Sequence, residues 1–512
     1  MSVTGIDWRT SPLVGRITGL CAAALFTIPL SALPHEPEIV WWLKIVLLAI
    51  GVLSALSPTS GVAVLAIALP LTTAIDALAG WSPAPAELTD ALMLACVAGA
   101  SWRLAMPGRG PATRLGPPAL LFGAVVIASA IVDLHGLQVV APRRLVLDEI
   151  WRHVTVRYWL DFREFVVLHV AVRWIAGLTL AVYIERLLRA SPDRAPFVLR
   201  VWIIAGIAGS LLTLLRLAEV VVSSSDGVIA TLVWVARDLR ISVLQPDVNA
   251  AGSYFALFLL PAFVVGWRRR RYWILAIAAP LAALAFALAR SRAAIGAVIA
   301  VACARLVRGP GSMIVRLGGI VAVLAIGAGL FVSIAESHTH ALWANASRVR
   351  VQMTQVAVRT IHKYPAFGVG LSDYIPRSQR FVTPDMTMLI TFAPNGENAH
   401  NNYLQVAAEL GIPGAVIFLW LMTVAVAPTW TGRNTAGNPE YEGMALGVAS
   451  FLVSAAFHQP WLVPEVFAIF MFAMGVTAGL APAPGRTSHG WMRDIALAGT
   501  VFYALSILLR SH

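Results

Sequence analysis

The chain has 512 residues, of which 58% are hydrophobic and only 12% are charged. A soluble protein of this length needs a much larger share of polar residues to cover its surface, so the composition indicates a membrane protein. The formal net charge of +12 does not indicate nucleic-acid binding, because the basic residues recur between apolar runs and do not gather on one soluble face.

Apolar runs long enough to cross a bilayer recur from one end of the chain to the other. Runs of about 17 to 25 residues match a hydrocarbon core of roughly 30 Å. Clear examples are Ile39–Leu56, Phe165–Ile184, Ala250–Trp267, Tyr272–Ala289, Leu317–Ile334 and Leu410–Val426. None of them alternates in the manner of a barrel strand, so we expect an all-α polytopic membrane protein with about 12 to 15 transmembrane helices.

The first apolar run leads into further membrane sequence without a small-residue cleavage site, so we expect no cleavable signal peptide. The three cysteines, Cys21, Cys96 and Cys303, all fall within apolar runs. A free cysteine in such a place usually packs as a small hydrophobic residue. We therefore expect neither a disulfide framework nor a thiolate metal site.

Two ionisable residues, His169 and Arg173, lie four residues apart within the run Phe165–Ile184. This spacing places them on one helical face, and ionisable residues inside a span usually face the bundle interior. Two interpretations are open. The pair lines the path of a lipid phosphate, or it pairs with a carboxylate across the bundle.

The orientation follows from Arg268–Arg271, four consecutive arginines beside a span. This is the strongest cytoplasmic signal in the chain under the positive-inside rule. Counting spans outward from it puts residues 133–164, 223–249 and 336–400 on the outer face. The chain then divides into an N-terminal transmembrane bundle (1–335), a large outer loop (336–400) and C-terminal transmembrane helices (401–512).

The outer segments are rich in arginine, against the positive-inside rule. Their basic residues are Arg143, Arg144, Arg152, Arg157, Arg163, Arg237, Arg240, Arg290, Arg292, Arg348, Arg350, Arg359, Lys363, Arg377 and Arg380. A guanidinium suits bidentate contact with phosphate or carboxylate oxygens. Two uses remain open for these arginines: some form an anion site, or they contact solvent and lipid headgroups.

Three short patterns precede the end of the outer loop. Asp247-Val248-Asn249 either caps the helix that follows or binds sugar. Arg290-Ser291-Arg292 occupies a hairpin between two spans, where the arginines reach headgroups or point at a buried pyrophosphate. Val349–His362 is predicted to form an amphipathic helix along the outer surface, with Val351, Val358 and Ile361 on one face, ended by Pro365 and a glycine turn. The alternative for this last segment is a packing helix without chemistry of its own.

The outer loop ends at His400-Asn401, followed after nine residues by Gly411-Ile412-Pro413-Gly414. Asn401 is placed to cap the helix that follows. Gly411 and Gly414 would share one face of that helix and permit close packing with a neighbour. His400 either holds the loop end by a hydrogen bond or takes part in chemistry.

Together these patterns resemble the O-antigen ligase family, whose relatives include polymerase-like enzymes. The family pattern H-[NSQ]-x(9)-G-x-x-[GT] matches His400, Asn401, Gly411 and Gly414 position by position. The arginine of its S-R-G/A pattern corresponds to Arg292. Its arginine 15 residues before a P-x-x-G turn corresponds best to Arg350, with Arg348 a close competitor. The resemblance is specific over roughly residues 247–426.

The resemblance implies a GT-C-like, inverting glycosyltransferase of the bacterial inner membrane that needs no metal or cofactor, with its active site in a large helical periplasmic loop. The donor would be a glycan on undecaprenyl pyrophosphate and the acceptor lipid A-core. A histidine suits removal of the acceptor proton, and arginines suit the leaving pyrophosphate. The expected catalytic residues are His400, Arg292 and Arg350, and the expected substrate-binding residues are Arg290, Arg348, Glu397, Asn401, His169 and Arg173.

Other functions fit part of this pattern. A polymerase of the same superfamily would join two lipid-linked glycans, and a protein O-oligosaccharyltransferase would use a protein acceptor. A transporter would also have many spans and buried charge. It would not require the arginine-rich outer loop, and we see no half-to-half repeat of the kind that many transporters show.

Overall fold

The chain forms helices because a segment in the hydrocarbon core must satisfy its own backbone N–H and C=O groups. The computed structural model describes residues 12–36, 39–72, 74–75, 85–104, 111, 113–138, 143–159, 165–225, 227–237, 241, 247–308, 312–335, 340–430 and 437–482. These residues contain no strand. Part of the predicted C-terminal transmembrane region, residues 483–512, lies outside the described residues. So do two arginines of the outer segments, Arg163 and Arg240.

The first half of the chain forms α1 (Pro12–Leu30), α2 (Trp41–Leu56), α3 (Pro58–Ala68), α5 (Pro85–Leu104), α6 (Gly116–Gln138), α7 (Arg143–Arg152), α8 (Val166–Ala190), α9 (Ala195–Ser223) and α10 (Val228–Arg237). The second half forms α11 (Val248–Arg268), α12 (Ala279–Ala289), α13 (Arg292–Arg308), α14 (Met313–Ala335), α15 (His340–Lys363), α16 (Tyr374–Ser378), α17 (Thr387–Phe392), α18 (Asn402–Val424), α19 (Ala427–Trp430), α20 (Pro439–Ser454) and α21 (Pro464–Leu480).

Five helices in the described part are long and apolar enough to cross a membrane: Gly116–Leu134, Val166–Ala190, Pro192–Ser223, Asn249–Arg268 and Asn402–Val424. Shorter apolar helices accompany them, among them Trp41–Leu56 and Pro464–Leu480. The expectation of an all-α polytopic membrane protein is therefore confirmed. The number of spans stays a prediction.

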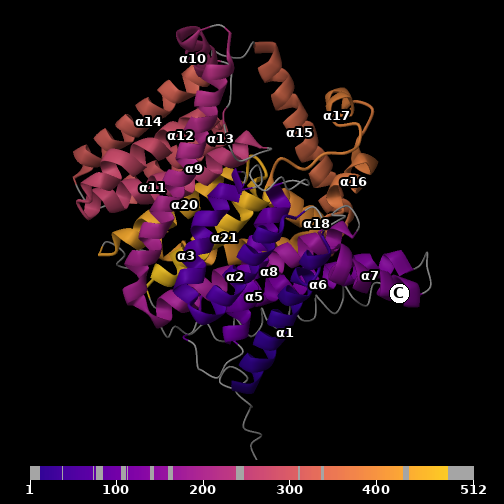
Figure 1. Ribbon diagram of the computed structural model, residues 1–512. Coiled ribbons are helices and arrows are strands. Elements are labelled where there is room, and N and C mark those ends of the chain that lie inside the picture. Colours follow the sequence, from indigo (N-terminus) through magenta and orange to yellow (C-terminus); the bar gives the residue numbers. More distant parts are fainter. Residues whose placement is uncertain are drawn as a thin grey trace, which may run out of the picture.

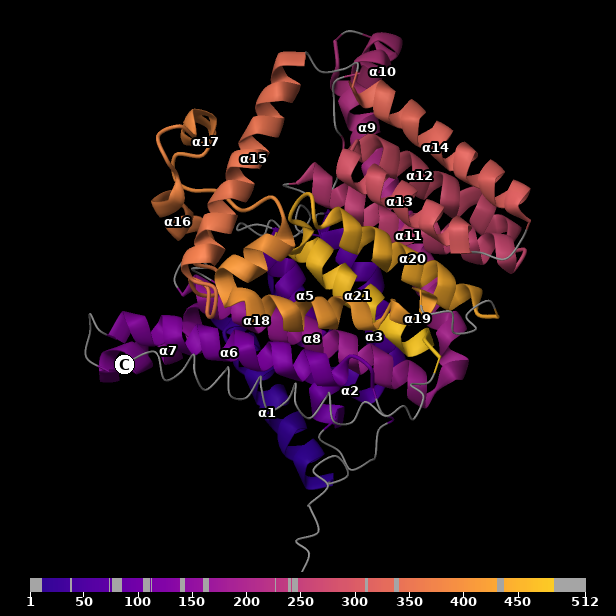
Figure 2. The same cartoon turned by 180° about the vertical axis from the view of Figure 1, so that it is seen from behind.

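The helices of the second half of the chain form two groups on either side of a central pair. In Figure 1, α11 to α14 lie on one side, and α15 to α17 rise above α18 on the other. The yellow helices α20 and α21 lie between these groups, and the reverse view shows the same order (Figure 2). Trp202 of α9 stacks on Phe258 of α11 and Phe472 of α21, with ring centroids 4.3 and 5.3 Å apart. The three helices therefore share one aromatic core.

Arginine lies at the far end of α11 and at both ends of α13. α11 runs from its cap Asp247 to Arg268, and α13 runs from Arg292 to Arg308. At the far ends, Arg269 pairs with Glu440 and Arg305 with Glu442, both at 2.6 Å, so the start of α20 is held there. α20 consequently ends beside the start of α11. We call the end of the bundle where α20 stops and α11 begins the site end.

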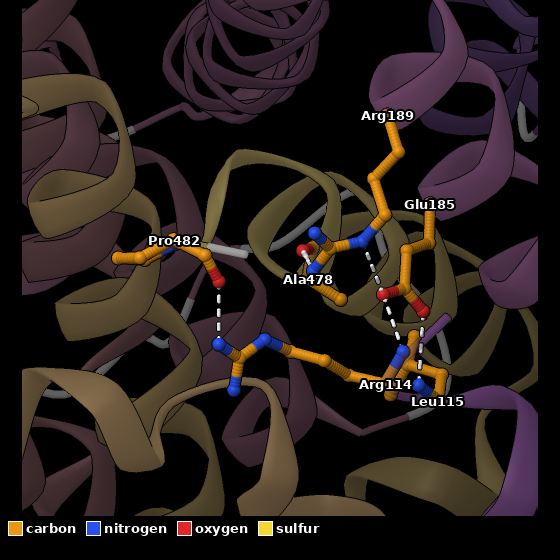
Figure 3. A network of polar contacts seen from close by, with 6 residues as sticks. All are labelled: Arg114, Leu115, Glu185, Arg189, Ala478 and Pro482. Carbon is orange, nitrogen blue, oxygen red and sulfur yellow. Dashed lines mark hydrogen bonds and ion pairs between the residues drawn. The ribbon is translucent and has the colours of Figure 1, made fainter. Parts of the chain in front are cut away.

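A buried carboxylate fixes the start of α6. Glu185 of α8 is 0% exposed, and its two oxygens accept hydrogen bonds from the backbone N–H groups of Arg114 and Leu115 at 2.6 and 2.9 Å. Arg189 donates to the same carboxylate at 2.7 Å and to the carbonyl of Ala478 in α21 (Figure 3). One side chain thus satisfies the otherwise unpaired donors before a helix and joins α6, α8 and α21.

We predict that Glu185→Ala destabilises the protein by about 3–5 kcal/mol, because the buried Arg189 guanidinium loses its counter-charge. Thermal unfolding of the purified protein in detergent measures the effect. Glu219→Ala is the control, since the Arg216–Glu219 pair is exposed and its loss is expected to change stability by no more than about 0.5 kcal/mol. Equal losses of stability in both variants would contradict the prediction.

Candidate functional site

Three helix ends meet at the site end of the bundle. The backbone N–H of Asn402, at the start of α18, donates to the carbonyl of Ala455 after α20, at 3.0 Å. Ser253 of α11 shares a 2.6 Å hydrogen bond with Ser454, the last residue of α20. The Ser253 hydroxyl also lies 2.8 Å from Nε2 of His458. The starts of α11 and α18 are therefore held against the end of α20.

The hairpin between α12 and α13 packs on the start of α11. A Cβ on Gly252 would lie only 2.3 Å from Cβ of Ser291, so the hairpin touches the α11 backbone directly. Arg290 adopts a left-handed φ of 50° and is 6% exposed, with its guanidinium toward the carbonyl of Val235. Arg292 begins α13 and is partly buried. The predicted hairpin is confirmed and lies next to the helix ends described above.

The long helix α15 brings Arg350 to the same place. Arg350 is partly buried and acts electrostatically on both His400 and His458. Among the described residues it makes no hydrogen bond or ion pair. Arg348 is exposed. The pKa shifts of His400 and His458 are caused in part by the charge of Arg350 and not by that of Arg348. The two arginines that the sequence left in competition therefore have different environments.

His400 sits in a turn that Asn398 and Asn401 shape. Its φ is 46°, and its N–H donates to Oδ1 of Asn398 at 2.9 Å. Asn401 accepts from the N–H groups of Tyr403 and Leu404 at 3.0 and 3.1 Å, so the predicted cap of α18 is confirmed. Nδ1 of His400 is buried without a hydrogen-bond partner among the described residues. The cap therefore places the imidazole at the helix start, with one ring nitrogen unused.

The electrostatic environment keeps this imidazole neutral. Burial lowers the pKa of His400, and the positive charge of Arg350 lowers it further. The carboxylates of Glu397 and Asp247 act in the opposite direction. Burial likewise lowers the pKa of His458. A neutral imidazole is the form that accepts a proton.

Two neighbouring carboxylates have local structural roles as well. Asp247 caps α11, because its Oδ1 accepts from the N–H of Asn249 at 2.8 Å. The capping interpretation of Asp247-Val248-Asn249 is therefore the one observed. Glu397 accepts from the N–H of Asn398 at 2.9 Å. Both carboxylates remain close enough to influence His400.

Helix α18 is broken at Gly411, and the break holds the turn that follows α15. Gly411 has φ 73° and ψ 173°, so the prediction that Gly411 and Gly414 share a face of one regular helix is wrong. Pro413 has no N–H to donate to the carbonyl of Glu409. The N–H of Ile412 donates to the carbonyl of Pro365 at 2.8 Å. The freed carbonyls of Ala408 and Glu409 accept from Val369 and Gly370 at 2.9 and 3.0 Å.

α15 itself ends at Lys363, just before Pro365, as the sequence predicts. Val351 and Val358 are exposed. The buried side of the helix carries Met353, Val356 and Ala357, which pack within the loop. α15 therefore also has the packing role that the sequence offered as an alternative.

His169 and Arg173 belong to a different cluster. Nε and Nη2 of Arg173 donate to both carboxylate oxygens of Asp90 in α5, at 2.6–3.0 Å. Nε2 of His169 lies 2.9 Å from Nε2 of His153. Of the two interpretations, pairing with a carboxylate across the bundle is the observed one.

Sequence reasoning did not find Ser253, Ser454 and His458. Each lies within or next to an apolar helix far from His400 in the sequence, and no local pattern marks it. The only local signal is the polar pair His458-Gln459 directly after α20. Within the described ranges, no group of three or more His, Cys, Asp and Glu side chains is arranged to hold a metal ion.

Residues 277–419 match the family model described as O-antigen ligase. The matched region begins just before α12 and ends within α18. It includes Arg292, Arg350 and His400, and leaves out Asp247 and His458. No curated protein matches the chain.

We predict that Gly411→Ala loosens the turn after α15. A Cβ at this position would lie 2.4 Å from the carbonyl oxygen of Ala366, and the positive φ adds about 1–2 kcal/mol of strain. Faster proteolysis within residues 364–373 and a lower unfolding temperature are expected. Gly296→Ala is the matched control, because a Cβ there meets nothing within 4 Å. Unchanged proteolysis in Gly411→Ala would contradict the role of the break.

Proposed function

We propose that the protein transfers a glycan from undecaprenyl pyrophosphate to lipid A-core, because residues 277–419 match the family model described as O-antigen ligase. The family implies a lipid-linked glycan donor and a separate acceptor. The observation that carries the proposal is that Arg350 lies close enough to His400, at the start of α18 and inside the matched region, to lower its pKa. These are the two chemical functions that such a transfer requires.

The arginines bind and stabilise the donor. When the anomeric carbon–oxygen bond breaks, negative charge develops on the departing pyrophosphate, and fixed guanidinium groups stabilise it most in the transition state. Arg350 is suited to this role because no described residue neutralises it. Arg292 lies on the hairpin that touches α11 beside Ser253. Arg290 and Arg348 have supporting roles in this proposal.

His400 accepts the acceptor's proton. The acceptor hydroxyl attacks the anomeric carbon from the face opposite the pyrophosphate, its proton passes to the free nitrogen of His400, and the leaving oxygen takes the bond's electron pair. One displacement inverts the anomeric configuration. Glu397 and Asp247 stabilise the imidazolium that forms. Asn401 holds the loop end next to this imidazole.

The proposed orientation places the site end in the periplasm and the protein in the inner membrane. What supports it is the run Arg268–Arg271 at the far end of α11, together with Arg305 and Arg308 at the far end of α13. Short basic segments of this kind stay on the cytoplasmic side.

We predict that His400→Ala and Arg350→Ala each reduce transfer about 100-fold or more. Purified protein is incubated with lipid-linked polysaccharide and lipid A-core, without an ion gradient, and glycosylated lipid A-core is measured. Arg380→Ala is the control, because Arg380 is an exposed arginine of the same loop. Retention of full transfer in either site variant would overturn the residue roles.

The same assay separates the neighbouring functions. Elongated polysaccharide that remains on undecaprenyl pyrophosphate would indicate a polymerase. Transfer to an added protein in place of lipid A-core would indicate an oligosaccharyltransferase. Transport of the lipid-linked glycan without transfer would exclude both the ligase and the polymerase.

The pH dependence tests the role of His400. Its base function needs the neutral imidazole, so activity falls as the pH drops through its pKa. Glu397 raises this pKa, so its removal favours the neutral form. We predict that Glu397→Gln shifts the acidic limb of the kcat/KM profile to lower pH, with Asp247, Arg350 and His458 left in place. A shift to higher pH, or none, would show that another group controls this limb.

A further inference from the structure

A cleft of about 610 Å³ lies between α6, the start of α8 and the turn that follows α15. Its lining combines charged and aromatic side chains: Asp133, Phe165, Tyr364, Phe367, Asp373 and Arg377. A cleft of roughly 300–1,000 Å³ with apolar walls and a few polar groups is typical of a small-ligand site. None of these six residues has a role in the transfer chemistry described above.

The walls of the cleft are held in place before any ligand binds. The turn is hydrogen-bonded to α18 through Val369 and Gly370. The N–H of Leu371 donates to Oγ of Ser129 in α6 at 2.9 Å, and the N–H of Ser372 donates to Oε2 of Glu409 at 3.1 Å. A site held by this many contacts loses little conformational freedom on binding.

The charges of the cleft differ from those around His400. Asp373 forms an ion pair with Arg377, so its charge is balanced. Oδ2 of Asp133 is buried without a hydrogen bond among the described residues. The Ser129 hydroxyl, the Leu371 N–H and the Arg377 guanidinium lie close to the same carboxyl group. A Cβ at Gly370 would be 2.6 Å from its Oδ1. The lining therefore presents two carboxyl groups and one guanidinium.

Hydroxyl groups suit this lining better. A carboxyl group exchanges hydrogen bonds with sugar hydroxyls. Tyr364, Phe367 and Phe165 offer the large apolar surfaces of aromatic rings to the C–H faces of a sugar ring. The lining thus matches a neutral sugar in both its polar and its apolar parts.

The cleft also lies within reach of the transfer site. Ala408, whose carbonyl holds the turn, follows His400 by eight residues. At 1.5 Å per residue this corresponds to about 12 Å along α18. A short oligosaccharide can span such a distance, so one end can occupy the cleft while a hydroxyl at the other end reaches the imidazole.

We propose that this cleft binds neutral sugars of the acceptor and thereby directs the attacking hydroxyl to His400. The inference rests on the proposed transferase function and adds to it a separate acceptor subsite, with Asp133 as its main polar contact. The donor's pyrophosphate and the acceptor's sugars then bind in different places, and neither substrate competes for the other's place.

The test measures acceptor binding directly and does not depend on turnover. The probe is core oligosaccharide freed of lipid and phosphate, titrated by native mass spectrometry against the full-length protein in detergent. Asp133→Asn keeps the shape of the side chain and replaces its carboxyl group by an amide, and is expected to weaken binding about tenfold. Asp385→Asn is the matched control, because Asp385 is an exposed carboxylate outside the cleft.

Gly370→Ala is a second variant, since the added Cβ would displace the Asp133 carboxylate; it is expected to weaken binding to a similar extent. Inorganic pyrophosphate is expected not to displace the probe. In a transfer assay, Asp133→Asn should raise the KM for the acceptor and leave the KM for the donor unchanged.

Each outcome decides one of the two proposals. Absence of probe binding to the wild-type protein, equal binding to Asp133→Asn, or displacement by pyrophosphate would overturn the acceptor subsite. If transfer occurs while Asp133→Asn binds normally, the transferase stands and the subsite falls. If Asp133→Asn loses binding while the wild-type protein transfers nothing, the sugar site stands and the transferase assignment falls.

Discussion

The break in α18 at Gly411 is the constraint on which the arrangement of the outer loop depends. Because Pro413 has no N–H and the N–H of Ile412 turns to Pro365, the carbonyls of Ala408 and Glu409 lose their partners within the helix. An unpaired carbonyl in an apolar bundle is costly. The turn Gly368–Gly370 supplies the missing N–H groups, so the end of α15 is fixed relative to α18 and its His400.

That arrangement places two polar regions along one helix. At the start of α18, Arg350 approaches a half-buried imidazole and lowers its pKa. About two helical turns further on, the carboxyl group of Asp133 lies against the turn held by the break. Electrostatic interactions are strong where water is largely excluded. The proposed binding of the donor's pyrophosphate and of the acceptor's sugars uses these two regions of the same scaffold.

Local signals in the sequence predicted much of this. The apolar runs marked α2, α8, α11 and α14, and the side-chain chemistry of Asn401 predicted the cap of α18. The three-residue spacing of Gly411 and Gly414 was misleading, because periodicity assumes an unbroken helix. The local cue to the break was Pro413. The N–H groups that bond the freed carbonyls belong to a turn some 45 residues earlier, and spacing alone does not reveal that contact.

The sequence by itself determined that this is a helical membrane protein, where several of its helices lie, and that its arginines and His400 belong to an O-antigen ligase-like pattern. Hydrophobicity, capping and proline geometry act over a few residues, so they can be read locally. Only the tertiary structure decided that Arg350 approaches His400, that Arg173 pairs with Asp90, and that Ser253 and His458 join α11 to the end of α20. These are contacts between helices, set by packing of the whole bundle.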